Sequence, residues 1–352
     1  MMSHTAIAAC LALALVGLVA GAQADVVQVR VQERWNSTWR AQALNQVPPM
    51  AVLHAPLTPF LDDGSWSLNI SAIPSLAKRA SEYGVTVIWT CGGMGQFYTL
   101  TVEERMKINE AWVEAAKPYG LYVIAHVGTT VLADAVTMAK HALSVGADAV
   151  ASVPPYYQNP GSISELIEFF KPIVEAAYPL PLYYYHIPGS TGYSVKMQDL
   201  ISQAEQSLPA LLGIKYVDSD TLDWYNIVQS YNNSHVLMFA PEPKLQSFGL
   251  GIGRGTVLAE DFFAPTYLRM HQHFVRGNIT AAQTEQAWKY SAMAVFSKYG
   301  GGSAERAVYR RIANVDLGPC RLPATNFDES NWPALQADLQ AVGFFDQVPP
   351  AM

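Results

Sequence analysis

Residues 182–217 have the sequence LYYYHIPGSTGYSVKMQDLISQAEQSLPALLGIKYV, in which two short apolar segments flank a longer amphipathic one. Segments 182–186 and 212–217 have the length and composition of buried strands, and 197–206 has the pattern of a helix. Strands that are apolar on both faces are typical of parallel sheets covered by helices. This stretch therefore predicts a strand–helix–strand unit of a parallel sheet.

The same alternation continues along the chain from residue 50. Eight such apolar runs, separated by helical segments, favour a closed parallel barrel over an open sheet. The predicted fold class is α/β, a (β/α)8 TIM barrel with additional C-terminal helices. The predicted strands are 51–57, 85–90, 122–127, 149–153, 182–186, 212–217, 236–239 and 255–259. The predicted helices include 102–116, 131–145, 163–177 and 197–206 in the barrel, and 281–299, 303–312 and 332–342 after it.

The N-terminal segment is predicted to lie outside the barrel. Residues 6–22 are apolar and uncharged, and Ala22-Gln23-Ala24 has the small-x-small pattern of a cleavage site, so residues 1–24 are predicted to be a secretory signal peptide. A membrane anchor is the alternative, but the run is short for a span. The remaining boundaries are predicted as an N-terminal extension at 25–48, the barrel at 49–278, and a C-terminal helical region packed on the barrel at 279–352.

Four Asn-x-Ser/Thr sequences agree with a secretory route, since a chain with this many asparagines would contain about one by chance. They predict glycosylation at Asn36, Asn69, Asn232 and Asn278. The expected location is extracellular or a lumenal compartment such as a vacuole. After signal removal two cysteines remain, Cys91 and Cys320, and they leave open one disulfide or two buried free thiols.

Charge and composition narrow the classes of partner. The chain has 352 residues, a formal net charge of −7 and no block of Lys or Arg. This argues against a nucleic acid, and after signal removal against a membrane, as partner. His271 and His273 are two residues apart on a predicted helix and face different ways. This pair therefore predicts no metal site.

Lys215 is the most informative residue, because it lies inside the apolar run 211–217. The other nine lysines lie in polar helical or loop segments. A buried amine loses its proton more readily, and a neutral amine is what imine formation with a ketone requires. The alternative is a structural ion pair with Asp218, Asp220 or Glu242.

Two further motifs follow predicted strands. In Tyr183-Tyr184-Tyr185-His186 a tyrosine at a strand end could relay protons, but composition does not choose among the three. In Cys91-Gly92-Gly93-Met94-Gly95-Gln96 backbone N–H groups could hold a carboxylate. Thr101 and Glu104 form a capping-box pattern after this turn.

Taken in order, Gly-Gly-x-Gly, Leu-Thr-x-Glu-Glu, Tyr-His-Ile-Pro and Gly-Ile-Lys resemble the N-acetylneuraminate lyase and dihydrodipicolinate synthase family, in particular its animal-type lyases. The resemblance covers roughly residues 50–345. It implies a class I aldolase in which Lys215 forms an imine with pyruvate or a longer 2-oxo acid. It also implies that Tyr185 is the acid/base residue and that Tyr157 is a further catalytic residue, which lies near a subunit interface and reaches toward the neighbouring site. The protein is expected to be a homotetramer built from two dimers, without a metal or a cofactor.

The departures from the family pattern fall in the substrate pocket. The resemblance places substrate contacts at Gly93, Met94, Val217, Glu242 and Ala259. Gly93 and Met94 stand where the family has two hydroxyl residues that hold the substrate carboxylate. Leu258-Ala259 replaces Gly-Ser, and Gly189-Ser190 lacks the arginine of the synthase branch. The catalytic residues are thus predicted to be retained, with a more apolar pocket for a less hydroxylated substrate.

Three functions follow from this combination. The first is a secreted Schiff-base lyase or aldolase acting on a small carbonyl compound, with sialic acid as the conservative choice of 2-oxo acid. The second is a repurposed Schiff-base enzyme that catalyses carbonyl condensation or dehydration in specialised metabolism. The third is a binding protein that has kept the barrel and lost turnover.

Overall fold

The computed structural model describes residues 34–251 and 253–348. The predicted signal peptide at 1–24, and the first part of the predicted extension, lie outside the described residues. No helix within the described ranges is long and apolar enough to cross a membrane.

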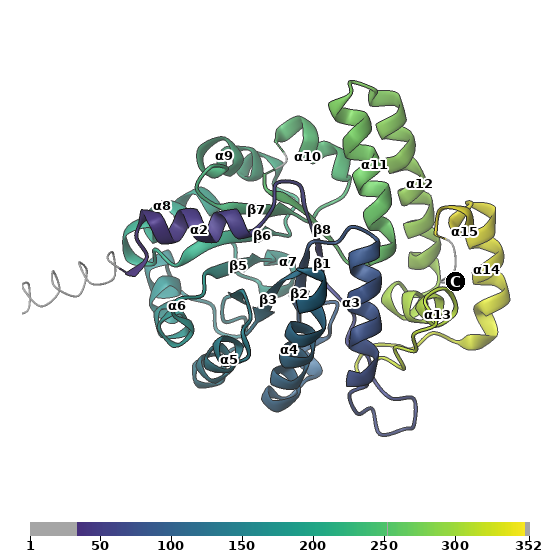
Figure 1. The fold of residues 1–352 in the computed structure, drawn as a ribbon, viewed down its shortest axis with the longest axis horizontal. Coiled ribbons are helices and arrows are strands. Elements are labelled where there is room, and N and C mark those ends of the chain that lie inside the picture. The colour runs from purple at the N-terminus through teal and green to yellow at the C-terminus, as the bar shows by residue number, and fades with distance from the viewer. Residues whose placement is uncertain (1–33, 252, 349–352) are drawn as a thin grey trace, which may run out of the picture.

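Eight parallel strands form a closed barrel, in which each strand pairs with the next and β8 pairs with β1 (Figure 1). The predicted TIM barrel is therefore confirmed. The strands are β1 (Ala51–His54), β2 (Val87–Thr90), β3 (Tyr122–His126), β4 (Ala149–Ser152), β5 (Leu182–His186), β6 (Leu211–Tyr216), β7 (Val236–Phe239) and β8 (Gly255–Leu258). Every strand residue is buried, which accounts for the nearly continuous apolar runs. Closure between β8 and β1 needs Gly255, because an added Cβ would overlap the Ala51 carbonyl.

Helices surround this barrel and extend it on one side. The outer ring comprises α3 (Ile73–Glu82), α4 (Val102–Ala116), α5 (Leu132–Val145), α6 (Ile163–Ala177), α8 (Met197–Ser207), α9 (Thr221–Tyr231), α10 (Lys244–Leu250) and α11 (Ala264–Val275). The predicted C-terminal helices are present as α12 (Ile279–Lys298), α13 (Gly302–Ile312), α14 (Trp332–Ala341) and α15 (Phe344–Gln347), which group beside α11 in Figure 1. Short segments are α7 (Pro188–Thr191), η1 (Ile70–Ala72), η2 (Phe97–Thr99), η3 (Lys117–Tyr119), η4 (Asp261–Phe263) and η5 (Glu329–Asn331).

The helix α2 (Ser37–Gln46) covers the N-terminal end of the barrel. Arg40 donates hydrogen bonds to the Pro209 and Leu211 carbonyls, which lie where β6 begins. Arg254, just before β8, donates to the Leu44 and Val47 carbonyls. Because this end is covered, the opposite end, where each strand finishes, is where a site can open.

Candidate active site at the C-terminal end of the barrel

Lys215 is the penultimate residue of β6, and its side chain points into the barrel. The residue is 3% exposed. Its Nζ lies 4.2 Å from the ring centroid of Tyr185 and 4.6 Å from that of Trp89. Among the described residues no carboxylate pairs with it, so the proposed alternative of a structural ion pair is wrong. The three candidate acids pair elsewhere: Asp218 with His186, Asp220 with Lys196, and Glu242 with Lys289 and Lys244.

The environment of Lys215 favours its uncharged form. Burial, followed by repulsion from Lys244, lowers the pKa of Lys215 to about 7. An amine with this pKa is largely neutral slightly above neutral pH and can then attack a carbonyl carbon. The aromatic rings around Nζ exclude water without supplying a counter-charge.

The three consecutive tyrosines of β5 divide by the alternation of a strand. Tyr183 and Tyr185 pack in the cluster that fills the barrel interior, whereas Tyr184 packs outward against the helix residue Phe170. Of the two inward residues, Tyr185 lies over the Lys215 amine. Burial raises the pKa of Tyr185 to about 12, and a hydrogen bond with the backbone of Gly93 opposes this rise. The phenol is therefore protonated across the neutral range and can donate a proton.

The glycine-rich turn after β2 lies directly against this pair. Cys91 and Gln96 adopt left-handed backbone conformations, with φ of 49° and 53°, which reverse the chain between β2 and η2. A Cβ built on Gly92 would lie 3.8 Å from the Lys215 Nζ, and one on Gly93 would lie 3.6 Å from the Tyr185 phenol oxygen. The absence of side chains at 92 and 93 thus leaves space beside the Lys215 amine and the Tyr185 phenol, respectively.

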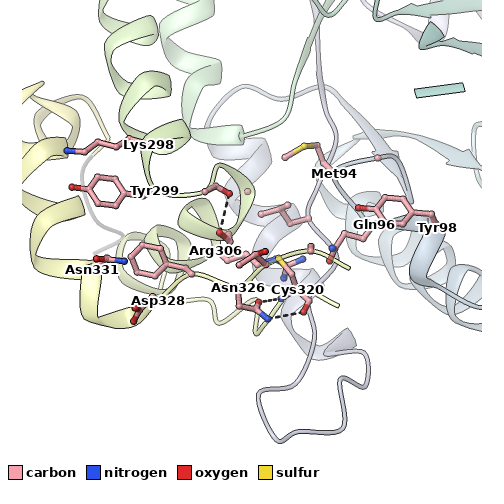
Figure 2. Close-up of a pocket in the computed structure, with 18 residues that line it drawn as sticks. Met94, Gln96, Tyr98, Lys298, Tyr299, Arg306, Cys320, Asn326, Asp328 and Asn331 are labelled. Carbon is pink, nitrogen blue, oxygen red and sulfur yellow. Dashed lines mark hydrogen bonds between the residues drawn. The ribbon is translucent and has the colours of Figure 1, made fainter. Parts of the chain in front are cut away.

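Two cavities adjoin the turn. The smaller, about 240 Å³, is lined by Tyr185 and Gly93 together with Phe97, Tyr98, Val153, Tyr156, Ile187, Ser190 and Thr191. The larger, about 790 Å³, has Gly93 and Met94 on its barrel side and residues of the C-terminal region on the other. Figure 2 shows Met94, Gln96 and Tyr98 across this cavity from Lys298, Tyr299, Arg306, Asn326, Asp328 and Asn331. The volume is that of a small-molecule site.

The wall of the larger cavity is attached to the barrel by Arg321. Its guanidinium makes hydrogen bonds of 2.6 and 2.7 Å to the two carboxylate oxygens of Glu104. Glu104 also completes the predicted capping box with Thr101, so one carboxylate caps α4 and holds the C-terminal segment. Since Thr101 follows the glycine-rich turn, this contact joins the cavity wall to the segment that follows that turn.

The remaining predicted substrate contacts are not brought into either cavity. Val217 directly follows β6 and Ala259 directly follows β8, and both are half-buried. Glu242 is held by Lys289 and lies 3.5 Å from the Lys244 Nζ. Burial raises the pKa of Glu242, but attraction to Lys244 and Lys289 and the hydrogen bonds from both residues together outweigh it and leave that pKa below its usual value. Glu242 is thus an ion-paired carboxylate rather than a free acceptor for substrate hydroxyls.

Tyr157 lies in the loop between β4 and α6 and is 94% exposed. Its neighbour Tyr156 is the one that lines the smaller cavity. Within a single chain Tyr157 therefore takes no part in the site. Its place at a subunit interface, and the homotetramer, stay predictions.

Sequence reasoning missed two aromatic residues of the site, Trp89 and His126. The His126 ring stacks near Trp89 and meets Tyr185 edge-on, with its Nδ1 2.8 Å from the Cys91 carbonyl. Burial, followed by repulsion from Arg105, lowers the pKa of His126 well below its usual value, so this ring is neutral. The available signal was their place in the last two residues of predicted strands, where barrel enzymes carry functional side chains.

The other candidate residues are distributed over the surface and the core. Cys91 and Cys320 are both free and buried, which decides the open question about a disulfide for these residues. Asn36 and Asn278 are exposed, and Asn69 and Asn232 are half-buried; their glycosylation stays a prediction. Within the described ranges no group of three His, Cys, Asp or Glu residues could hold a metal ion.

Comparison with known proteins gives a consistent result. The model of the dihydrodipicolinate synthetase family matches residues 48–342. The N-acetylneuraminate lyase of Pongo abelii is 29% identical over 294 residues, which cover 82% of this chain and 91% of that protein. The solved structure of Proteus mirabilis N-acetylneuraminate lyase has a TM-score of 0.78 at 25% identity, covering 84% of this chain and 99% of that one. The structure of DHDPS from Cyanidioschyzon merolae has a TM-score of 0.75 at 26% identity, covering 84% and 98%.

Proposed function

The chain belongs to the dihydrodipicolinate synthetase family, and from this premise we propose that it is a lysine Schiff-base lyase or aldolase acting on a 2-oxo acid. The family consists of class I aldolases and lyases that use a lysine imine. The observation that carries the proposal is the pairing of a buried, unpaired Lys215 with the Tyr185 phenol at the barrel mouth. Similarity to N-acetylneuraminate lyases makes a pyruvate-type imine the first choice.

The arrangement supports a simple reaction sequence. The neutral Lys215 amine adds to the ketone carbon, and the resulting hydroxyl takes up a proton from the solvent and leaves as water, which gives a protonated imine. Cleavage of the bond between C3 and C4 then leaves an electron pair that the imine takes up, giving an enamine and a free aldehyde. Tyr185 moves the proton between the hydroxyl of the aldehyde fragment and C3, since its phenol lies beside the same nitrogen.

The substrate tail is expected to lie in the larger cavity. That cavity begins at Gly93 and Met94, beside the catalytic pair, and its far wall carries Arg306, Asn326 and Asn331. These side chains suit a tail with oxygen-bearing groups, whereas Met94 makes the near wall apolar. A 2-oxo acid with a polar distal end matches this division.

Reductive trapping tests the proposal. Incubation with pyruvate and borohydride should reduce an imine to a stable secondary amine and add the corresponding mass to the peptide that contains Lys215. The measurement is peptide mass spectrometry. Acetate, which lacks a ketone, is the control and should add nothing. An unmodified Lys215 under conditions that preserve the fold would end the proposal.

A second candidate function rests on the missing hydroxyls at positions 93 and 94. A protein that cannot hold the substrate carboxylate could be a binding protein that has lost turnover, or an enzyme for a different carbonyl compound. The test is a double variant, Gly93→Ser with Met94→Thr, which restores a hydroxyl at both positions. Residue 93 has room for a side chain, because an added Cβ would make ordinary contact with Tyr185.

The double variant separates these readings by its rate of aldol cleavage of N-acetylneuraminate. If the chain is a lyase that lost its carboxylate site, a gain of about tenfold or more is expected, since two hydroxyl hydrogen bonds to a charged group are restored. The single variant Gly93→Ala is the control for added bulk. No gain, together with turnover of an unrelated carbonyl substrate by the unmodified protein, would support a new enzyme instead.

A further inference from the structure

A second lysine is buried at the same end of the barrel. Lys244 begins α10 and is 2% exposed. Its Nζ donates hydrogen bonds to the Ala240 and Pro241 carbonyls, which directly follow β7. The sequence placed Lys244 in a loop, so its burial was not expected. A buried ammonium is costly, and a structural role alone would be served by an uncharged donor.

The backbone fixes where this ammonium lies relative to Lys215. In the β6–β7 pairing Lys215 is opposite Met238. Beyond the paired residues the two chains continue side by side, because the Ala240 N–H donates to the Tyr216 carbonyl at 2.9 Å. The Ala240 carbonyl, which holds the Lys244 Nζ, is therefore next to the chain segment that carries Lys215. Both amines are at the C-terminal end of adjacent strands.

The counter-charge around Lys244 is shared. Glu242 is bound by Lys289 of α12 and lies 3.5 Å from Lys244, so one carboxylate serves two ammoniums. The next acid, Glu260, is hydrogen-bonded to Glu305 of α13. Burial, followed by repulsion from Glu260, raises the pKa of Glu305 well above its usual value, so Glu305 keeps its proton and adds no negative charge here. Because Glu242 is shared with Lys289, the positive charge of Lys244 is not fully neutralised, and it acts on Lys215.

We propose that Lys244 is a positioning residue for the imine chemistry: its buried ammonium, held at the end of β7 beside β6, disfavours a second positive charge on Lys215 and keeps that amine nucleophilic. The inference rests on the proposed function for its biological meaning. A neighbouring cation is a known physical means of activating an amine nucleophile. It fits this site because no described carboxylate faces Lys215.

The surroundings of both amines agree with this assignment. Lys215 faces Trp89, Tyr185 and the neutral His126 from the other strands. Lys244 faces Glu242, Lys289 and Glu260, and burial lowers its pKa to about 8. Lys215 has a pKa of about 7. Lys244 has the carboxylates of Glu242 and Glu260 to favour its charged form, whereas Lys215 has none among the described residues, so the positive charge is favoured on Lys244 over Lys215.

Lys244→Gln is the decisive variant, because its amide can still donate to the Ala240 and Pro241 carbonyls but carries no charge. Lys244→Arg is the matched control that keeps the charge, and Lys244→Met is a second uncharged variant. Competitive acetylation with acetic anhydride, followed by peptide mass spectrometry from about pH 6 to about pH 10, measures the pKa of Lys215, since only the neutral amine reacts.

The pKa of Lys215 is expected to rise by about one unit in Lys244→Gln, so that its acetylation at about pH 7 falls roughly fivefold. Near pH 10 the variant and the parent protein should react equally. Lys244→Arg should leave the titration in place. A titration of Lys215 that is unchanged in a folded uncharged variant, or a loss of reactivity that is the same at every pH, would overturn the inference.

The readout is independent of the proposed function because acetylation needs no substrate. If pyruvate and borohydride leave Lys215 unmodified but Lys244→Gln still shifts its titration, the proposed function fails and the coupling of the two lysines stands. If trapping succeeds and the titration does not move, the proposed function stands and the coupling of the two lysines fails.

Discussion

Lys215→Met is expected to abolish both the pyruvate–borohydride adduct and the exchange of pyruvate methyl protons with deuterium. Exchange reports the enamine that forms from the imine, so it needs no knowledge of the full substrate. Methionine has a similar length and no amine. The expected loss of exchange rate is on the order of a thousandfold or more, because the covalent intermediate cannot form. Proton NMR in deuterium oxide measures it.

The same variant should be more stable than the parent protein at neutral pH. Burial, followed by repulsion from Lys244, lowers the pKa of Lys215 to about 7 in the folded state, whereas an unfolded lysine titrates near 10.4. Between these values the unfolded chain binds more protons, so the contribution of Lys215 to stability rises with pH and is lost as the pH falls toward 7. Removing the amine should raise the free energy of unfolding at about pH 7 by on the order of 4 kcal/mol.

Urea unfolding of both proteins at about pH 7 and about pH 10 measures this difference, which should shrink at the higher pH. A gain in stability together with a loss of exchange would show that the variant lost chemistry and not its fold. Lys196→Met, which removes a surface lysine paired with Asp220, is the control and should change neither property by much. An adduct that persists in Lys215→Met would mean that another lysine forms the imine.

The barrel could be predicted because a parallel strand that is buried on both faces needs an apolar run, and such a run occurs eight times in the chain. The lengths of the strands could not. The first strand was predicted over 51–57, but β1 is Ala51–His54, and Ala55 and Leu57 are buried in the loop that follows. An apolar run indicates that its residues are buried. It does not distinguish a residue that pairs with the neighbouring strand from one that is packed just beyond the end of the strand.

The site was predictable where one strand determines it. Lys215 stands out because an amine interrupts an apolar run. Tyr185 came from the family resemblance, because alternation along β5 turns both Tyr183 and Tyr185 inward and does not choose between them. Glu242 and Lys244 were not predictable in the same way. Glu242 is paired with Lys289, which is more than forty positions later on α12, and no local sequence pattern indicates that contact. The wall formed by residues 320–331 has the same origin, since long-range packing places it against Met94.

Tyr185→Phe is expected to separate imine formation from proton transfer. The phenylalanine ring can keep its place 4.2 Å from the Lys215 Nζ, so the amine remains buried and the borohydride adduct should still form. Methyl exchange and aldol cleavage need a proton to move at C3 or on the leaving aldehyde, and their rates should fall by about 10²- to 10⁴-fold. The measurements are the extent of trapping and the rate of exchange on the same preparation.

Tyr184→Phe is the matched control, because Tyr184 lies next to Tyr185 in the same strand but packs outward against Phe170 and does not meet the Lys215 amine. Its exchange rate should stay within about twofold of the parent protein's, since no proton passes through it. Equal losses in both variants would point to a structural effect of β5 and would count against the role of Tyr185.

His126 is the rival for the proton-transfer role, since its ring also meets Tyr185 in the barrel interior. Its Nδ1 is engaged by the Cys91 carbonyl, and burial with repulsion from Arg105 holds its pKa well below the usual value. A ring that is so hard to protonate is a poor proton donor. The Tyr185 phenol starts protonated, and its hydrogen bond with the Gly93 backbone stabilises the phenolate that remains after donation. The phenol can therefore give up a proton and recover it within one turnover, and undiminished exchange in Tyr185→Phe would require that a substrate hydroxyl or a water molecule carries the proton instead.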